Sequence, residues 1–423
     1  MVFHPREGRV QPCSPATPAP APRPLDRRTV LRAGALLGLG GLTGACSAKG
    51  AGGGTAGPAA TALARIDAPV TLPLPGGVAA VANGLRPESG TLSLLNYADY
   101  LSPDVIKAFG QKYGVKVEVT TFTTMTEAVE KLRSGQARYD VFFPTADVVD
   151  RVARAGLLQP LNHSYLPDLG NAWPTLQNPF YDQGSRYTVP YNVFSSGIGY
   201  RADVVTALPQ NPYDLFWDTR YAGKVYLLDD YREAPAMTML RRGRTDLNTE
   251  DPAVLKTAGD DLRQLIGTVR VKVGTQEATI IPDGSATVHQ AWSGDMVTAQ
   301  YNLAKGESAK VLGYWYPHGR KGVVGTDCMS VVRGAPHPVL AHLFLNHMLD
   351  TTVAGQNMSW LGYQPAQSAF TPEYMTKNQY VPENLSSAIV TEADYTAGTQ
   401  LLQLSTAGEK LWQNTWAGFK AGS

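Results

Sequence analysis

The chain has 423 residues, a formal net charge of +1 and 43% hydrophobic residues, so it is long enough to build more than one hydrophobic core. It has no basic run, no interleaving of basic and aromatic residues and no zinc-finger spacing, which argues against a nucleic-acid partner.

Residues 1–45 are predicted to be an export signal. Arg27 and Arg28 precede a short apolar run, Ala33–Leu42, and Thr43-Gly44-Ala45-Cys46 follows. This pattern resembles a twin-arginine (Tat) signal joined to a bacterial lipoprotein cleavage box, in which Cys46 would carry the lipid anchor. The apolar run is too short to span about 30 Å of hydrocarbon, which argues against a transmembrane helix. We therefore expect an exported protein, lipid-anchored on the outer face of the cytoplasmic membrane, in the periplasm or at the cell surface.

Removal of this signal changes both the charge and the cysteine count. Residues 1–45 hold six arginines against Glu7 and Asp26, so the remaining chain has a net charge near −3. Cys13 leaves with the signal and Cys46 would be acylated, so Cys328 remains alone. No intramolecular disulfide is then available, and we expect the core to supply the stability.

Residues 46–87 are predicted to form a flexible tether, because they are rich in Ala, Gly, Pro and Thr and poor in large apolar residues. A short extended piece is expected at Val70–Leu72. The remaining stretch of about 335 residues is more than one hydrophobic core usually holds, so two lobes are expected.

Residues 91–155 alternate between predicted strands and helices. Strands are predicted at 91–96, 115–119 and 139–143, and helices at 103–113, after a capping box at Thr124–Glu127, and at 147–155. This βαβαβα order predicts a parallel sheet covered by helices.

The second part of the chain has longer strands and a helical C-terminus. Strands are predicted at 193–200, 224–228 and 323–333, and helices at 295–304 and 339–349. Asp251 and Pro252 predict a helix start, and Gly267 predicts the end of that helix. The last helix is expected to bury Leu411 or Trp412, with Trp416 and Phe419.

The motifs of common enzyme classes are absent from the sequence. It has no Gly-x-Ser-x-Gly, no P-loop, no Gly-x-Gly-x-x-Gly after a strand and no His-Glu-x-x-His. The seven histidines are scattered, and His342 and His347 have the wrong spacing for one helix face. We therefore expect no enzymatic activity, no cofactor and no metal.

Acidic and aromatic residues follow several predicted strands, where ligands bind in open α/β sheets. Carboxylates pair with ammonium groups, and aromatic rings attract cations and pack on methylenes, so this set suits a flexible organic polycation. Each residue alone could instead cap a helix or close a turn. The stretches are Asn96–Tyr100, Pro144–Asp147, Asp229–Glu233, Trp292, Asp327 and Tyr363.

From about Leu92 to Tyr363 the sequence resembles the spermidine/putrescine-binding proteins of bacterial polyamine ABC transporters. The most specific stretch is Leu228-Asp-Asp-Tyr-Arg-Glu233. The others that carry the resemblance are Leu95–Tyr100, Tyr139–Pro144, Val189–Tyr191, Tyr221–Val225, Trp292–Gly294 and Gly362-Tyr363.

The resemblance implies an α/β, two-lobe periplasmic-binding-protein fold (type II-like), each lobe a mostly parallel sheet flanked by helices and joined by crossing hinge strands. Residues 88–192 and 326–366 would form the first lobe and 193–325 the second, with helices of 367–423 mainly on the second lobe. The ligand-binding residues that it implies are Tyr97, Asp99, Tyr100, Thr145, Asp147, Asp230, Glu233, Trp292, Asp327 and Tyr363.

Four positions depart from the family pattern. Tyr97 stands where the family usually has Trp, and Ala98 stands where it often has Thr. Asp147 stands where an aromatic residue is common, and Gly325 stands where a second Trp is common. The aromatic box is therefore expected to be thinner and the acid content higher.

The function expected from these features is that of a monomeric solute-binding protein. It would capture spermidine, putrescine or a related amine, a choice that stays open, and deliver it to the permease and ATPase subunits of an ABC transporter. One alternative is a binding protein for a sugar, an amino-acid derivative or ferric iron. Another is a surface hydrolase, which predicts a pair of acids or a nucleophile–base couple with strongly perturbed pKa.

Overall fold

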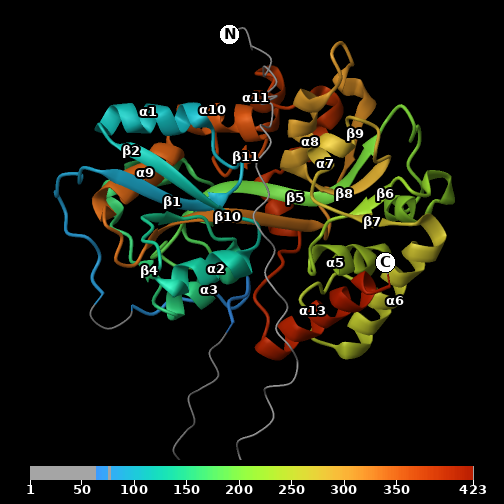
Figure 1. Ribbon diagram of the computed structural model, residues 1–423, viewed down its shortest axis with the longest axis horizontal. Coiled ribbons are helices and arrows are strands. Elements are labelled where there is room, and N and C mark those ends of the chain that lie inside the picture. Colours follow the sequence, from blue (N-terminus) through green and yellow to red (C-terminus); the bar gives the residue numbers. More distant parts are fainter. Residues whose placement is uncertain (1–62, 75–77, 423) are drawn as a thin grey trace, which may run out of the picture. The chain divides into compact units, whose positions relative to one another are not determined.

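The computed structural model describes residues 63–74 and 78–422. Its centre is an 11-stranded sheet with the strand order β2-β1-β3-β10-β5-β8-β6-β7, and β4, β9 and β11 pair with the two central strands (Figure 1). The predicted signal residues Arg27 and Arg28 and the predicted lipid-anchor residue Cys46 lie outside the described residues.

The strands fall into two groups that meet at β5 (Val189–Arg201) and β10 (Val323–Val332). The first group is β1 (Thr91–Tyr97), β2 (Lys116–Phe122), β3 (Val141–Phe142) and β4 (Leu158–Gln159). The second group is β6 (Val225–Leu227), β7 (Lys272–Val273), β8 (Val288–Trp292), β9 (Leu312–Trp315) and β11 (Gln364–Pro365).

Helices cover both faces of this sheet (Figure 1). Beside the first group lie α1 (Pro103–Tyr113), α2 (Met125–Ser134), α3 (Ala146–Arg154), α9 (Pro338–Leu349) and α10 (Thr351–Leu361). Beside the second group lie α5 (Glu233–Arg241), α6 (Pro252–Val269), α7 (Glu277–Ile280), α8 (Ser293–Ala299) and α13 (Thr406–Lys420). The short helices are α4 (Pro174–Gln177), α11 (Pro372–Lys377) and α12 (Glu392–Ala397).

The predicted parallel sheet of residues 91–143 is confirmed. β1 pairs in parallel with β2 on one side and with β3 on the other. Helix α1 begins at Pro103, buries Val105 and Phe109, and ends at Gly114 with a φ of 66°. Only a residue that tolerates this left-handed conformation can stop the helix there, which is why glycine is suited to the position.

The crossing strands β5 and β10 run antiparallel and join the two groups. Their register shifts between Asp327, which lies opposite Asn192, and Cys328, which lies opposite Pro190. β10 pairs with β5 on both sides of the shift, and after it β10 also pairs with β3 and β4 on its other edge. A bulge of this kind bends a strand and redirects a side chain, and here it lies at a predicted ligand-binding residue.

Two helix boundaries differ from the sequence prediction. Helix α6 does begin after the Asp251 cap, but it passes through Gly267 and ends at Val269, and its C-cap residue Arg270 has a φ of 52°. The prediction of a stop at Gly267 was wrong, because burial of Val269 at 0% exposure outweighs the cost of about 1 kcal/mol for an interior glycine. The helix predicted at 295–304 is shorter, since α8 ends at Ala299 and a 3-10 turn, Gln300–Asn302, follows.

The predicted capping box of α2 forms only in part. Thr124 accepts a hydrogen bond from the Glu127 N–H, as expected. The Glu127 carboxylate, however, accepts the N–H of Thr123 at 2.8 Å and not that of Thr124. The reciprocal bond is therefore displaced by one residue and still satisfies a free donor at the helix start.

Part of the segment expected to be a flexible tether lies in the core. Leu72 is 0% exposed, and Val70 accepts a hydrogen bond from the Gln183 N–H and donates one to the Phe180 carbonyl. Further along, the Glu88 carboxylate accepts the N–H groups of Val339 and Leu340 in the first turn of α9. The low apolar content of the segment did not predict these contacts, because the two buried side chains of Val70 and Leu72 are enough to fix a short segment.

Candidate ligand-binding site

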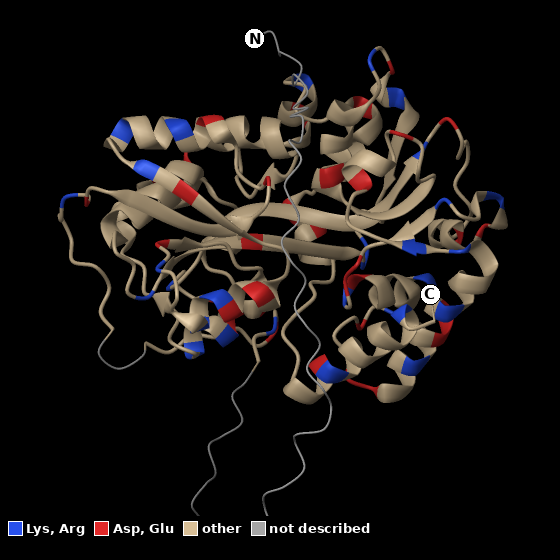
Figure 2. Cartoon of the chain, in the orientation of Figure 1, with Lys and Arg blue, Asp and Glu red and all other residues tan. Residues whose placement is uncertain are grey.

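Asp327 lies at the centre of the crossing strands. Apart from Arg201 at the end of β5, it is the only charged residue on β5 and β10, and Figure 2 shows Lys and Arg mainly on the outer helices and loops. Tyr100 donates a 2.5 Å hydrogen bond to its carboxylate. Burial, together with the charge of Asp147, raises the pKa of Asp327 to about 7. This carboxylate is therefore hydrogen-bonded, but no ion pair among the described residues compensates its charge.

Glu233 is a second buried carboxylate, 5% exposed at the start of α5. One oxygen, Oε1, accepts hydrogen bonds from the Ser196 hydroxyl at 2.7 Å and from Trp292 Nε1 at 3.2 Å. The other oxygen, Oε2, is buried without a partner among the described residues. Burial is the main cause that raises the pKa of Glu233 to about 7, with the charge of Asp230 as a second cause. An oxygen buried in this way is poised to accept a hydrogen bond from a ligand.

Asp230 combines both roles that the sequence allowed for it. Its Oδ1 accepts the backbone N–H groups of Arg232 at 2.7 Å and Glu233 at 2.9 Å, so it caps the turn into α5. Burial nevertheless raises its pKa, and Asp147 contributes to the rise. The side chain therefore helps to hold the loop and also adds negative charge to the cluster.

Thr145 and Asp147 lie at the start of α3, on the opposite side of the crossing strands. Thr145 donates a 2.5 Å hydrogen bond to Asp147 and forms an isolated β-bridge with Asp327. Burial, with the charges of Asp327, Asp147 and Asp230 adding to it, raises the pKa of the Tyr97 hydroxyl. One tyrosine is thus influenced by carboxylates from both groups of strands.

Aromatic rings line the space beside these carboxylates. The ring of Tyr100 meets those of Tyr97 and Tyr363 edge to face, with centroid distances of 5.5 and 5.1 Å. Trp292 reaches the cluster through its bond to Glu233. The structure therefore brings together nine of the ten predicted ligand-binding residues: Tyr97, Tyr100, Thr145, Asp147, Asp230, Glu233, Trp292, Asp327 and Tyr363.

Asp99 is not brought into this cluster. Its side chain is exposed, its φ is 52°, and no hydrogen bond or ion pair within the described part of the chain joins it to the other nine residues. A left-handed φ is tolerated by Asp, so the residue turns the chain between β1 and α1.

Two further acids adjoin the aromatic wall, and the sequence analysis did not identify them. Tyr363 donates a 2.7 Å hydrogen bond to Asp295, and burial raises the pKa of Asp295 to about 6. Glu277 lies against Asp295, and burial together with the Asp295 charge raises its pKa as well. Asp295 could have been found from its position one turn after Trp292, whereas Glu277 on the short helix α7 carries no sequence signal.

Phe194 lies beside the aromatic residues of this cluster, opposite Gly325, where the family pattern has a second tryptophan. It lies opposite Gly325 in the β5–β10 pairing, and a Cβ at Gly325 would collide with its ring. The Phe194 ring lies 6.3 Å from that of Tyr363, centroid to centroid. The aromatic wall is therefore completed from the neighbouring strand.

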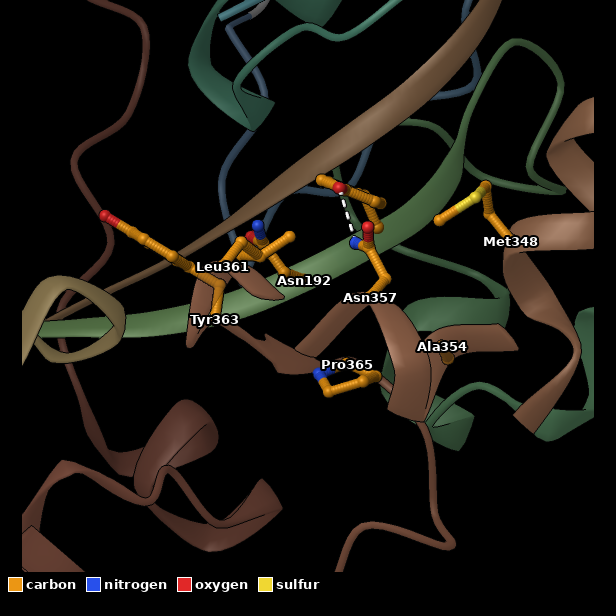
Figure 3. A pocket seen from close by; sticks show the side chains of 8 residues that line it. Asn192, Met348, Ala354, Asn357, Leu361, Tyr363 and Pro365 are labelled. Atoms are coloured by element: carbon orange, nitrogen blue, oxygen red, sulfur yellow. Dashed lines mark hydrogen bonds between the residues drawn. The ribbon is translucent and has the colours of Figure 1, made fainter. Parts of the chain in front are cut away.

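Tyr100 is held in place from both ends. Asn192 donates a 2.6 Å hydrogen bond to its hydroxyl, and the Tyr191 hydroxyl donates a 2.5 Å hydrogen bond to its carbonyl. Asn357 supports Tyr191 at 2.7 Å, next to a cavity of about 10 Å³, enough for one water molecule (Figure 3). This support fixes the ring and hydroxyl that meet Asp327.

The chemistry of the cluster suits an organic cation. Asp147, Asp230, Glu233 and Asp327 outnumber the nearby cation Arg232, whose guanidinium donates to the Leu402 carbonyl at 2.9 Å. Ammonium groups form strong hydrogen bonds to carboxylates, and tyrosine and tryptophan faces attract them further.

Among residues 63–74 and 78–422, no group of three or more His, Cys, Asp or Glu side chains is arranged to hold a metal ion. No helix in the same residues is long and apolar enough to cross a membrane.

The chain is similar in sequence and structure to known proteins. It is 29% identical over 275 residues to the spermidine/putrescine-binding periplasmic protein 1 of Haemophilus influenzae, an alignment that covers 64% of this chain and 74% of that protein. It is 27% identical over 296 residues to the putrescine/agmatine-binding protein of Pseudomonas aeruginosa, covering 67% and 80%. A solved structure of a putative spermidine/putrescine ABC transporter from Listeria monocytogenes matches with a TM-score of 0.67 and 23% identity, covering 78% of this chain and 98% of that one.

The model of one protein family, described as bacterial extracellular solute-binding protein, matches residues 104–380. This match extends over more than half of the chain. The solved structure from Listeria monocytogenes has the same two-lobe α/β fold as the chain. The chain therefore belongs to the bacterial extracellular solute-binding protein family.

Proposed function

We propose that this protein is an exported solute-binding protein that captures a polyamine and delivers it to the permease and ATPase subunits of an ABC transporter. The observation that carries the proposal is the buried cluster of Glu233 and Asp327, whose pKa values are raised mainly by burial. The carboxylates of this cluster outnumber the nearby cation Arg232, so a further cation would balance their charge. A polyamine would supply that cation, and the tyrosine rings around Tyr100 would pack on its methylenes.

The two ends of the site suit a ligand with more than one ammonium group. Asp327 and Glu233 would accept hydrogen bonds from one part of the ligand, and Asp295, held by Tyr363, would accept one from another. Separate acids along one aromatic wall favour a flexible chain with several cationic groups over a compact amino acid. Relatives named for spermidine, putrescine and agmatine support this class and leave the individual amine open.

Two features outside the site belong to the same proposal. The lobes would comprise residues 88–192 with 326–366, and 193–325 with the C-terminal helices of 367–423, which the pairing of β5 and β10 with both strand groups supports. Arg27, Arg28 and Cys46 would direct export and lipid anchoring. Since one chain supplies every residue of the site, we expect a monomer to bind.

Isothermal titration calorimetry on the purified protein tests the proposal. Putrescine, spermidine and agmatine should release or absorb measurable heat, whereas maltose, glycine and Fe³⁺ should not. Ligand that binds only the folded state must also raise the melting temperature, which gives an independent readout. Clear sugar binding without amine binding would contradict the proposal at the level of the substrate class.

The hydrolase alternative has one observation in its favour. Glu233 and Asp327 have raised pKa values, as a general acid would. Their hydrogen bonds to Ser196, Trp292 and Tyr100, and the membership in a solute-binding family, favour binding over turnover. Ester and glycoside substrates incubated with the protein should therefore remain intact.

A further inference from the structure

The loop 229–233, which bears the site carboxylates of Asp230 and Glu233, has contacts on its other side with the C-terminal segment 400–420. This loop joins β6 to α5, and α13 lies alongside α5 and α6 (Figure 1). Three of its residues, Asp229, Tyr231 and Arg232, contact the C-terminal segment. The residues of the loop thus divide between the ligand site and a support behind it.

Tyr231 makes a partly buried contact of this support and Arg232 makes a buried one. The Tyr231 hydroxyl donates a short hydrogen bond to Glu409 on α13. Arg232 is 5% exposed, donates to the Leu402 carbonyl at 2.9 Å, and lies with its Cζ 4.6 Å from the ring centroid of Trp412. The ion pair between Lys420 and Asp229 adds little, because both side chains are nearly half exposed.

The support is itself anchored to the second lobe. Asn248 accepts hydrogen bonds from Arg232 at 2.8 Å and from the Leu402 N–H at 2.7 Å, and thereby joins loop and C-terminal segment. Ser405, the cap of α13, donates to Glu250 at 2.5 Å. Trp412 is 0% exposed and donates to the Thr249 carbonyl at 2.9 Å. The segment is therefore a fixed part of the second lobe and can set the position of the loop.

We propose that the C-terminal segment 400–420 positions the acidic loop for ligand binding, with Glu409 as its main positioning residue. This inference rests on the proposed function, because it assigns to Glu409 an effect on the polyamine affinity of Asp230 and Glu233. The family match ends at residue 380, so the element lies in a part of the chain outside the matched region. Binding groups held rigidly before the ligand arrives lose less entropy on binding, and that is the gain we assign to Glu409.

Three variants and a control separate positioning from other causes. Glu409→Ala removes the acceptor, Glu409→Gln keeps an acceptor of the same size without the charge, and Tyr231→Phe removes the donor. Phe419→Leu is the control for stability, because Phe419 is fully buried on the same helix and its side chain makes only apolar contacts, with no hydrogen bond to the loop. Calorimetry with putrescine and spermidine gives the dissociation constants, and thermal melting without ligand gives the stability of each variant.

We expect Glu409→Ala to weaken polyamine binding by about fivefold to twentyfold and Glu409→Gln to bind within about twofold of the wild type. Phe419→Leu should melt at a lower temperature with unchanged affinity. Equal losses for the glutamine and alanine variants would mean that Glu409 acts by long-range charge, and this would overturn the proposal. An unchanged affinity of Glu409→Ala would also overturn it.

A double-mutant cycle adds a readout that a merely structural role would not move. If Glu409 acts through the loop carboxylates, Glu409→Ala should have a clearly smaller effect on affinity once Glu233 is replaced by glutamine, because only Asp230 then remains to be positioned. Additive losses in Glu233→Gln/Glu409→Ala would contradict positioning. A wild-type protein that binds no polyamine would refute the proposed function and this inference together, whereas wild-type binding with an insensitive Glu409→Ala refutes the inference alone.

Discussion

Phe194 lies directly opposite Gly325 in the pairing of β5 with β10, and its ring occupies the space that a Cβ at Gly325 would need. An aromatic residue on one strand thus depends on a glycine on the other. Phe194 places an aromatic ring beside Tyr363, although position 325 itself carries no side chain.

Substitution of Gly325 tests this dependence. We expect Gly325→Ala to lower the free energy of unfolding by about 1–3 kcal/mol through overpacking against the Phe194 ring. Phe194→Ala should weaken polyamine binding by about 0.5–2 kcal/mol if the ring faces the cation. In the double variant the Gly325→Ala penalty should largely disappear, as urea unfolding would reveal, and a purely additive result would argue against the collision.

Asp327→Asn should separate binding from folding. The amide oxygen of the introduced asparagine can still accept the Tyr100 hydrogen bond, and the substitution removes a buried charge, so we expect an unchanged or higher melting temperature without ligand. Loss of a buried partner for an ammonium group should weaken polyamine binding by about 2–5 kcal/mol, which calorimetry measures directly.

The matched control is Asp251→Asn. Asp251 caps α6 through the Ala253 N–H, and asparagine caps nearly as well, so affinity and stability should both stay close to the wild type. A lower melting temperature of Asp327→Asn with normal affinity would mean that this carboxylate only stabilises the fold around β10.

The raised pKa values predict opposite pH dependences for stability and for binding. Glu233 has a folded-state pKa of about 7 against an ordinary value of 4.5, so the folded protein binds more protons than the unfolded one between these values. Its contribution to stability without ligand is therefore present at low pH and is lost as pH rises from about 4.5 through 7. Polyamine affinity should increase over the same window, because the ligand needs the ionised carboxylate.

Comparison with Glu233→Gln isolates this effect from other titrating groups. His289, whose pKa burial lowers to about 4, destabilises the fold as pH falls below its ordinary value of 6.5. This opposing contribution is common to both proteins and cancels in the difference of their melting temperatures. A difference between wild type and variant that is flat between about pH 5 and 8 would contradict the raised pKa of Glu233.

The N-terminal segment offers a prediction with an internal control. Leu72 is 0% exposed and Leu74 is 54% exposed, only two residues away. Leu72→Ala should lower the free energy of unfolding by about 2–5 kcal/mol, whereas Leu74→Ala should leave it within about 0.5 kcal/mol. Equal small effects in urea titrations would mean that this segment is not part of the folded core.

Export and anchoring can be tested in cells by fractionation with a labelled fatty acid. We expect Arg27→Lys with Arg28→Lys to block export, since a receptor reads the arginine pair. Cys46→Ala should release soluble protein, because acyl chains would hold the wild type to the membrane. Wild-type protein that is fully soluble and unlabelled would refute the lipid anchor.

Local signals were sufficient for much of the fold. The bounds of α1 at Pro103 and Tyr113 agree with the prediction, because proline and glycine act on the backbone of their own segment. The predicted stop of α6 at Gly267 was wrong because the end of this helix depends on the packing of Val269, which is not a local signal. Leu72 was missed because it packs in a core cluster whose other members lie mostly far along the chain, among them Phe122 and Tyr187.

For the site, the sequence alone determined which acids and aromatic residues follow the strands, because the hydrophobic periodicity and the ends of strands are local properties of the chain. It could not determine that Asp99 is exposed and makes no hydrogen bond or ion pair with the cluster among the described residues, that Asp295 and Glu277 meet beside Tyr363, or that Phe194 fills the space at Gly325. Those relationships depend on strand register and on helices that are distant in sequence, and only the tertiary structure brings such residues within contact distance. Burial decides the electrostatics in the same way, since Glu233 and Asp327 acquire raised pKa values only where the folded chain removes water from their carboxylates.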